Sequence, residues 1–322
     1  MFSSTTAAYA QFENFAVSCN ERMVDMSKIP VFTGSGTAMI TPFDKDNNID
    51  YAKMAELIDL QYAGGTSAIV VNGTTGENAT QPLDEHEAFV DFCVKHTAGR
   101  MKVISGVGSN DTMTSIRLAR SAEASGVDGI LMVTPYYNRT SQAGLVQHFT
   151  YVADRVNVPM ILYNVPTRTT VSISVDTYKV LSEHPNINGV KEASGDLSLF
   201  ARTRAVCGDE LNVWSGNDDN TVAMMAMGAV GVISVASNIM PAVVTELCDL
   251  CLKNDFKAAT ALYCKYADFF EKMFIEVNPV PVKTAMNMLG MNVGELRLPL
   301  WKMGEDNAAK LRKCLEDYGL LK

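Results

Sequence analysis

Ile187-Asn188-Gly189-Val190-Lys191-Glu192-Ala193-Ser194-Gly195 combines a short apolar run, a lysine at its end and a polar loop that contains glycine. Short apolar runs of this kind are typical of strands that are buried on both faces, as in a parallel sheet. A lysine normally lies on a solvated face, so a lysine at the end of a buried strand needs a chemical reason. One such reason is that a desolvated amine can form a Schiff base with a carbonyl compound.

The same succession of apolar run, polar loop and amphipathic stretch recurs from Phe32 onward. Eight apolar runs are spaced roughly 20–35 residues apart, at residues 36–40, 68–71, 103–106, 129–133, 159–163, 189–191, 211–214 and 231–235. Eight such β–α units predict an α/β fold of the (β/α)8 TIM barrel type, in preference to an open doubly wound sheet. An open sheet that binds a dinucleotide would be favoured by GxGxxG after the first run, and no such motif stands there.

The ends of the chain differ from this repeating part. Four helical stretches follow the eighth run, at residues 241–253, 256–273, 280–289 and 307–318. They predict a barrel over residues 31–240 and a small C-terminal helical appendage over residues 241–322. Residues 1–30 are rich in Ser, Thr and Ala and lack both a basic start and a continuous apolar stretch. We expect a disordered N-terminal extension there and no secretory signal.

The composition narrows the class of partner. The chain has 322 residues, of which 47% are hydrophobic and 20% charged, as in an ordinary globular protein. A net charge of −9 argues against nucleic acid, because phosphate binding needs clustered Lys and Arg. The uncharged stretch 221–245 is interrupted by glycines and Pro241, so we expect no membrane span and no membrane partner.

The seven cysteines form an odd, scattered set. Such a set predicts free thiols in a reducing compartment, and hence a cytoplasmic protein, rather than a disulfide framework. Cys248 and Cys251 form one CxxC without a second pair, which we interpret as two thiols on a helix face and not as a metal or redox site.

In a (β/α)8 enzyme the active site lies at the carboxyl ends of the strands, which selects Lys191 and Tyr163 as candidate site residues. They end neighbouring runs, and adjacent strands lie about 4.8 Å apart, so both side chains should project into one pocket. Attack on a carbonyl needs the neutral amine, so burial must lower the pKa of Lys191. The alternative is a structural ion pair with Glu192, which should point to the other face of the strand.

Two further loops at this end carry groups that could bind anions. Gly73-Thr74-Thr75-Gly76 offers backbone N–H groups and two hydroxyls to a carboxylate or phosphate, although a plain strand-to-helix turn would look the same. Arg168 could clamp a second carboxylate, or be an ordinary surface arginine. All four histidines fall within predicted helices or at their ends, so the sequence predicts neither a metal site nor a histidine-based triad.

Several motifs together resemble one family. These are GTTGE at 73–77, TPYYN at 134–138, YNVPTRT at 163–169, GVKEASG at 189–195, SGNDD at 215–219, GVISV at 231–235 and NPVPVK at 278–283. The chain resembles the dihydrodipicolinate synthase and N-acetylneuraminate lyase family of class I aldolases over about residues 32–321. Thr74 and Arg168 are similar to the synthase branch, which condenses pyruvate with L-aspartate 4-semialdehyde on the lysine-forming diaminopimelate route. An aldolase for 2-keto-3-deoxygluconate or N-acetylneuraminate, and a catalytically silent barrel that only binds, are the alternatives.

The resemblance implies a role for each site residue. The catalytic set is Lys191 as the amine that forms the pyruvyl Schiff base, Tyr163 as the proton relay, and Thr74 and Tyr137 as hydroxyls coupled to it. The substrate-binding set is Thr75 for the pyruvate carboxylate, Arg168 for the semialdehyde carboxylate, and Gly216 and Ile233 as pocket-lining backbone. The resemblance also implies no metal, no dissociable cofactor, and a homodimer or homotetramer in which Tyr137 crosses a dimer interface.

One departure from the family bears on regulation. Members that are inhibited by L-lysine are similar to this chain at Asn110, Tyr136 and His86, but carry histidine in place of Leu83 and glutamate in place of Thr114. The missing carboxylate would pair with the ammonium group of the effector. We therefore expect weak or absent inhibition by L-lysine, measured as the inhibition constant in a steady-state assay. A constant below about 1 mM, well within the range of ordinary ligand affinities, would contradict this expectation.

Overall fold

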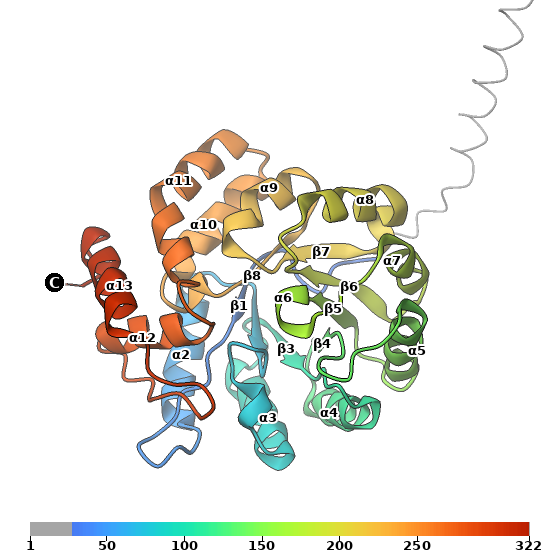
Figure 1. The fold of residues 1–322 in the computed structure, drawn as a ribbon, viewed down its shortest axis with the longest axis horizontal. Coiled ribbons are helices and arrows are strands. Elements are labelled where there is room, and N and C mark those ends of the chain that lie inside the picture. The colour runs from blue at the N-terminus through green and yellow to red at the C-terminus, as the bar shows by residue number, and fades with distance from the viewer. Residues whose placement is uncertain (1–27, 322) are drawn as a thin grey trace, which may run out of the picture.

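The computed structural model describes residues 28–321, which form a closed barrel of eight parallel strands in sequential order (Figure 1). The strands are β1 (Gly34–Ala38), β2 (Ala68–Val71), β3 (Lys102–Gly106), β4 (Gly129–Val133), β5 (Met160–Asn164), β6 (Ile187–Glu192), β7 (Asn212–Ser215) and β8 (Gly231–Ser234). Each overlaps one of the eight apolar runs, and β8 pairs with β1 to close the barrel. The predicted (β/α)8 TIM barrel is confirmed.

Helices surround the barrel and connect successive strands (Figure 1). They are α2 (Tyr51–Ala63), α3 (Leu83–Thr97), α4 (Thr112–Ser125), α5 (Gln142–Ala153), α7 (Val175–Ser182), α8 (Leu197–Cys207), α9 (Thr221–Ala226) and α10 (Pro241–Leu252), with a single turn, α6 (Pro166–Thr169), after β5. Side-chain caps fix several starts; for example, the Asp111 carboxylate accepts from the backbone N–H of Met113 and Thr114 at the start of α4. Within residues 28–321 no helix has both the length and the apolar character needed to cross a bilayer.

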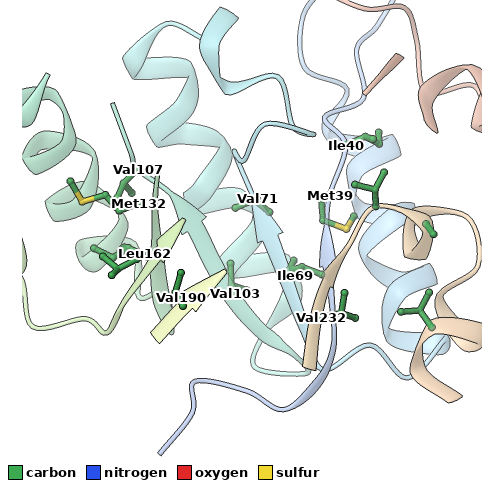
Figure 2. Close-up of a cluster of buried hydrophobic side chains, with 14 of the residues drawn as sticks. Met39, Ile40, Ile69, Val71, Val103, Val107, Met132, Leu162, Val190 and Val232 are labelled. Atoms are coloured by element: carbon green, nitrogen blue, oxygen red, sulfur yellow. The ribbon is translucent and has the colours of Figure 1, made fainter. Parts of the chain in front are cut away.

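Alternation along the strands divides the core into two layers. Ile69 and Val71 point outward and pack against the helices, as do Met132 and Leu162 (Figure 2). The intervening residues point into the barrel, where Phe32 stacks on Trp214 with ring centroids 5.1 Å apart. Since Phe32 precedes β1, this stack fills the amino end of the barrel and leaves the carboxyl end for the site.

The C-terminal helices continue from the barrel without a break. After α10 come α11 (Phe256–Lys272), α12 (Val280–Met288) and α13 (Glu305–Asp317), which confirms the expected helical appendage. Helix α10 packs on β1 and α2 and also on α11, so it belongs to both parts. The boundary at residue 240 therefore stays a prediction.

The predicted N-terminal extension lies almost wholly outside the described residues, which begin at Lys28. The Lys28 ammonium donates to the carbonyls of Ser182, His184 and Ile187, at 2.5, 2.8 and 2.8 Å. Residues 28–30 are thus held against the end of α7 and the start of β6.

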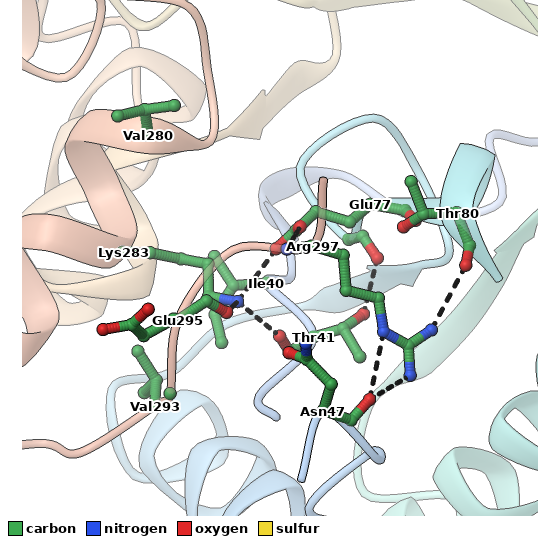
Figure 3. A network of polar contacts seen from close by, with 12 residues as sticks. Ile40, Thr41, Asn47, Glu77, Thr80, Val280, Lys283, Val293, Glu295 and Arg297 are labelled. Atoms are coloured by element: carbon green, nitrogen blue, oxygen red, sulfur yellow. Dashed lines mark hydrogen bonds and ion pairs between the residues drawn. The ribbon is translucent and has the colours of Figure 1, made fainter. Parts of the chain in front are cut away.

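A buried ion pair fastens the C-terminal region to the mouth of the barrel (Figure 3). Lys283 of α12 is 1% exposed, and its Nζ lies 2.8 Å from Oε1 of Glu77, in the loop after β2. The same ammonium donates to the carbonyls of Thr41 and Glu295, at 3.2 and 2.8 Å. The other carboxylate oxygen of Glu77 accepts from the backbone N–H of Arg297 at 2.9 Å. Burial lowers the pKa of Lys283, and the negative charge of Glu77 opposes this shift.

We expect Lys283→Met to lower the free energy of unfolding by about 3–5 kcal/mol, because it leaves the Glu77 carboxylate buried without its cation. The measurement is urea unfolding followed by circular dichroism. The double variant Lys283→Met, Glu77→Gln should recover part of the loss, since no buried charge is then left unpaired. Lys313→Met is the matched control, because that lysine pairs with Asp317 on an exposed helix face. Equal small effects of Lys283→Met and Lys313→Met would contradict the role of the pair.

Candidate active site

A cavity of about 500 Å³ opens at the carboxyl end of the barrel, where parallel (β/α)8 barrels carry their active sites. It is lined by Thr75, Tyr163, Val165, Thr167, Arg168, Lys191, Ala193, Gly216, Asn217, Val235, Phe274, Glu276, Val277 and Asn278. A second cavity of about 220 Å³ lies next to it, around Gly73, Thr74 and Tyr136. Tyr163, Val165 and Arg168 line both cavities and form the wall between them.

Lys191 and Tyr163 meet as the sequence predicts. They are paired in register across β5 and β6, and Lys191 Nζ lies 4.6 Å from the centre of the Tyr163 ring. Lys191 is 5% exposed, and this burial lowers its pKa from 10.5 to about 8; the negative charge of Asp218 opposes the shift and the positive charge of Arg168 adds to it. Among the described residues Lys191 forms no ion pair, so the structural pairing with Glu192 is wrong.

The environment of Tyr163 makes it a proton donor and acceptor rather than a stable phenolate. Burial raises its pKa, while the charge of Arg168 and a hydrogen bond with the Thr74 side chain oppose that shift. The phenol therefore stays protonated near neutral pH and can pass a proton between Thr74 and a group bound at Lys191.

The loop after β2 brings its two threonines to different sides of Tyr163. Thr74 lines the smaller cavity, whereas Thr75 lines the larger cavity together with Lys191. The residues that flank the loop, Asn72 and Glu77, have φ angles of 54° and 55°, in the left-handed region. This conformation turns the loop back over the barrel end, and the Thr75 hydroxyl accepts a hydrogen bond from Asn278 Nδ2 at 2.9 Å.

Arg168 lies in the single turn α6, which begins at Pro166. The side chain lines both cavities, and its Nη2 donates to the carbonyl of Asn278 at 2.8 Å. A guanidinium that lines a cavity has further N–H groups, which a carboxylate could accept from. Arg168 is exposed, and its role as a clamp for a carboxylate stays a prediction.

Gly216 and Ile233 occupy different positions. Gly216 lines the larger cavity, and its N–H donates to the carbonyl of Glu192 at 2.7 Å. A Cβ atom at Gly216 would lie 2.5 Å from that of Ala193, so only glycine allows this approach. Ile233 is fully buried within the barrel and is not among the residues that line either cavity; its predicted role stays a prediction.

Tyr137 lies apart from the other candidates. It is 93% exposed in the loop after β4, with φ at 67°, and it lines neither cavity. Its neighbour Tyr136 does line the smaller cavity. Within one chain, Tyr137 therefore does not join Tyr163 and Thr74.

Two groups that hold the site in place were missed from the sequence. The Glu192 carboxylate accepts from Asn164 Nδ2 at 3.0 and 3.1 Å and from the Tyr178 hydroxyl at 2.7 Å, which ties the end of β5 to the end of β6. Asp218 is buried and accepts from the backbone N–H groups of Val235 and Ala236, both at 3.1 Å. The motifs contained both acids, but only the fold shows what they contact.

Comparison with known proteins agrees with this geometry. Residues 31–318 match the Dihydrodipicolinate synthetase family. The chain belongs to this family. A 4-hydroxy-tetrahydrodipicolinate synthase from Thermoanaerobacter sp. (strain X514) is 44% identical over 295 residues, which cover 91% of this chain and 99% of the relative.

Solved structures give the same result. The crystal structure of dihydrodipicolinate synthase from Aquifex aeolicus superposes with a TM-score of 0.88 at 46% identity, covering 90% of this chain and 99% of that one. A monomeric dihydrodipicolinate synthase variant superposes with a TM-score of 0.87 at 37% identity, covering 90% and 98%. The likeness thus extends over the barrel and the C-terminal helices alike.

The lowered pKa of Lys191 predicts how its reaction with pyruvate depends on pH. At pH 7 an amine with a pKa of about 8 is roughly 9% neutral, against about 0.03% for an amine at 10.5. The initial rate of trapping with pyruvate and cyanoborohydride should rise about tenfold per pH unit below 8 and level off above it. The measurement is adduct formation by intact mass between about pH 6 and pH 10. A rate that still rises steeply at about pH 10 would contradict the lowered pKa.

Proposed function

We propose that this chain condenses pyruvate with L-aspartate 4-semialdehyde to 4-hydroxy-tetrahydrodipicolinate, a step of lysine biosynthesis by the diaminopimelate route. The observation that carries the proposal is the buried Lys191 amine, with its pKa lowered, beside Tyr163 in a cavity that Thr75 and Arg168 also line. These are an imine-forming amine, a proton relay and two groups that bind carboxylates, one for each substrate. The names of the relatives support the same reaction.

The reaction follows from the chemistry of these groups. The neutral Lys191 amine attacks the ketone carbon of pyruvate and water leaves, which gives a protonated imine. Loss of a proton from the methyl carbon gives an enamine, and this carbon attacks the aldehyde of the second substrate. The amino group of that substrate then attacks the imine carbon, closes the ring and releases Lys191. One water is released overall, and Tyr163 with Thr74 moves the protons.

We propose further that the active unit is a homodimer or homotetramer in which Tyr137 of one copy completes the site of another. The exposed position of Tyr137, in a left-handed turn beside the smaller cavity wall, supports this assignment. The buried, unpaired thiols support a reducing, cytoplasmic setting; among the described residues they belong to Cys93, Cys207, Cys248, Cys251 and Cys314.

Trapping tests the reaction class directly. Incubation with pyruvate and borohydride should add the reduced pyruvyl group to Lys191, located by peptide mass spectrometry, and Lys191→Ala should abolish it. A panel of aldehydes then defines the second substrate. No adduct would mean a binding protein, and a preference for a sugar aldehyde would mean another aldolase.

We expect Arg168→Leu to lower kcat/KM for L-aspartate 4-semialdehyde about 100-fold, because a charged bidentate contact to its carboxylate is lost. Trapping of pyruvate at Lys191 should change by less than about threefold, since that step does not use this contact. Arg168→Lys keeps the positive charge but loses the bidentate contact, so its kcat/KM should lie between those of the native protein and Arg168→Leu. Equal losses in trapping and in turnover would contradict the assignment of Arg168 to the second substrate.

A further inference from the structure

Strand β6 carries one residue more than the stretch of β5 beside it. Its residue Ile187 pairs with Met160. The next pair along the two strands joins Gly189 to Ile161, so Asn188 is left without a partner in β5 and forms a one-residue β-bulge. Side chains alternate between the two faces of a sheet, and a shift of one residue exchanges the faces for every residue beyond it. The bulge therefore decides which side chains of β6 point into the barrel.

Lys191 points into the cavity because of this bulge. It lies opposite Tyr163, whose side chain belongs to the inner layer of the barrel. The residue before it, Val190, packs outward in the layer beneath the helices (Figure 2). A continuous ladder from Ile187 onward would instead place Lys191 opposite Asn164, on the outer face of the sheet. The amine would then be turned away from the cavity that it lines.

The inserted residue is stabilised at the amino end of the barrel. Asn188 is 9% exposed, and its Nδ2 donates to the carbonyl of Ile29 at 2.8 Å. Its Oδ1 accepts from the backbone N–H of Val31 and from Asn212 Nδ2, both at 3.3 Å. A buried amide needs such partners, so the residues before β1 help to stabilise the bulge.

Beyond the bulge, a buried carboxylate specifies the register. Glu192 is 5% exposed and lies opposite Asn164, whose Nδ2 donates to its two oxygens at 3.0 and 3.1 Å. The Tyr178 hydroxyl and the backbone N–H of Ser194 also donate to this carboxylate, at 2.7 and 2.8 Å. A slip of one residue would turn the carboxylate to the inner face and leave these donors without their acceptor, which costs free energy.

We propose that Glu192 is a positioning residue for the reaction: through Asn164 it holds β6 in the bulged register and so keeps the Lys191 amine turned into the cavity. As a statement about the reaction, this inference rests on the proposed function. Glu192 is not among the described residues that line either cavity, and its side chain lies on the opposite face of the strand from Lys191. It therefore acts on the chemistry through the orientation of its neighbour.

The pKa of Lys191 reports that orientation. In the cavity, burial lowers it to about 8; the negative charge of Asp218 opposes this shift and the positive charge of Arg168 adds to it. Tyr163 lies beside the amine, and burial raises the pKa of this phenol, which keeps it uncharged near neutral pH. When the end of β6 is loosened, water reaches the amine and its pKa returns towards the ordinary value for lysine.

Competitive labelling with acetic anhydride measures this pKa without pyruvate, because only the neutral amine reacts and peptide mass spectrometry resolves Lys191 from other lysines. The native midpoint should lie at about pH 8. Glu192→Gln should raise it by about one pH unit or more, and the initial rate of pyruvate trapping at pH 7 should fall about tenfold. Loss of a negative charge alone would lower the pKa of an amine, so a rise distinguishes lost positioning from lost charge.

Two neutral substitutions separate positioning from general stability. Asn164→Ala removes the tie between β5 and β6 without changing any charge, so it should also raise the midpoint. Tyr178→Phe is the matched control, because it removes another hydrogen bond of the same carboxylate but leaves that tie. Its midpoint should stay within about 0.3 pH unit of the native value.

An unchanged or lower midpoint in either Glu192→Gln or Asn164→Ala, or an equal rise in Tyr178→Phe, would overturn the inference. Asn164→Ala decides alone if Glu192→Gln does not fold. Pyruvate separates this inference from the proposed function. If the native chain forms no pyruvate adduct while the midpoints move as expected, the proposed function fails and the orientation of Lys191 by Glu192 stands. If the adduct forms and the midpoints do not move, only the role of Glu192 is wrong.

Discussion

The ion pair between Lys283 and Glu77 connects the C-terminal region to the active-site loop, and the geometry of the cavity depends on it. Two opposite charges that are almost fully buried are tolerated only when each is paired and its remaining hydrogen bonds are met. The Lys283 ammonium also donates hydrogen bonds to the carbonyls of Thr41 and Glu295, and the Glu77 carboxylate also accepts one from the backbone N–H of Arg297 (Figure 3). The pair therefore defines one position for α12 and one for the loop after β2, and Asn278 lies just before α12.

Burial has opposite consequences at the two interior lysines. At Lys283 the neighbouring carboxylate keeps the amine charged, so the desolvation penalty is offset by an ion pair. At Lys191 the carboxylate of Asp218 is already held by two backbone N–H groups and acts only through its charge. Burial then lowers the pKa of Lys191 to about 8, which gives a usable fraction of neutral amine. The same physical effect accompanies an ion-paired lysine in one place and an unpaired amine with a lowered pKa in the other.

The sequence predicts what depends on local pattern. The apolar runs locate all eight strands, and strand ends bring Lys191 and Tyr163 together because neighbouring parallel strands end at one edge. It does not predict contacts made by distant segments. Lys283 and Glu77 are 206 residues apart, and Asn278 and Thr75 are 203 apart. These residues belong to motifs that can be recognised in the sequence, but the periodicity of the sequence does not predict that the motifs contact each other. Tyr137 shows another limit, because the described residues of one chain do not bring it to Tyr163 and Thr74, and its proposed role between two copies stays a prediction.

The position of Asn278 shows what the helices beyond the barrel contribute, because this residue lies in the loop before α12 and lines the larger cavity. A strand-end site offers side chains from β-strands and the loops after them, all of which point into the same opening. In this chain the polar groups among them are mostly cationic or hydroxyl-bearing, which suits two carboxylates and a ketone. The loop before α12 adds Glu276, Val277 and Asn278 to the lining of the cavity, and Asn278 contacts both Arg168 and Thr75. The C-terminal region is therefore part of the cavity wall, and the buried ion pair between Lys283 and Glu77 fastens it there.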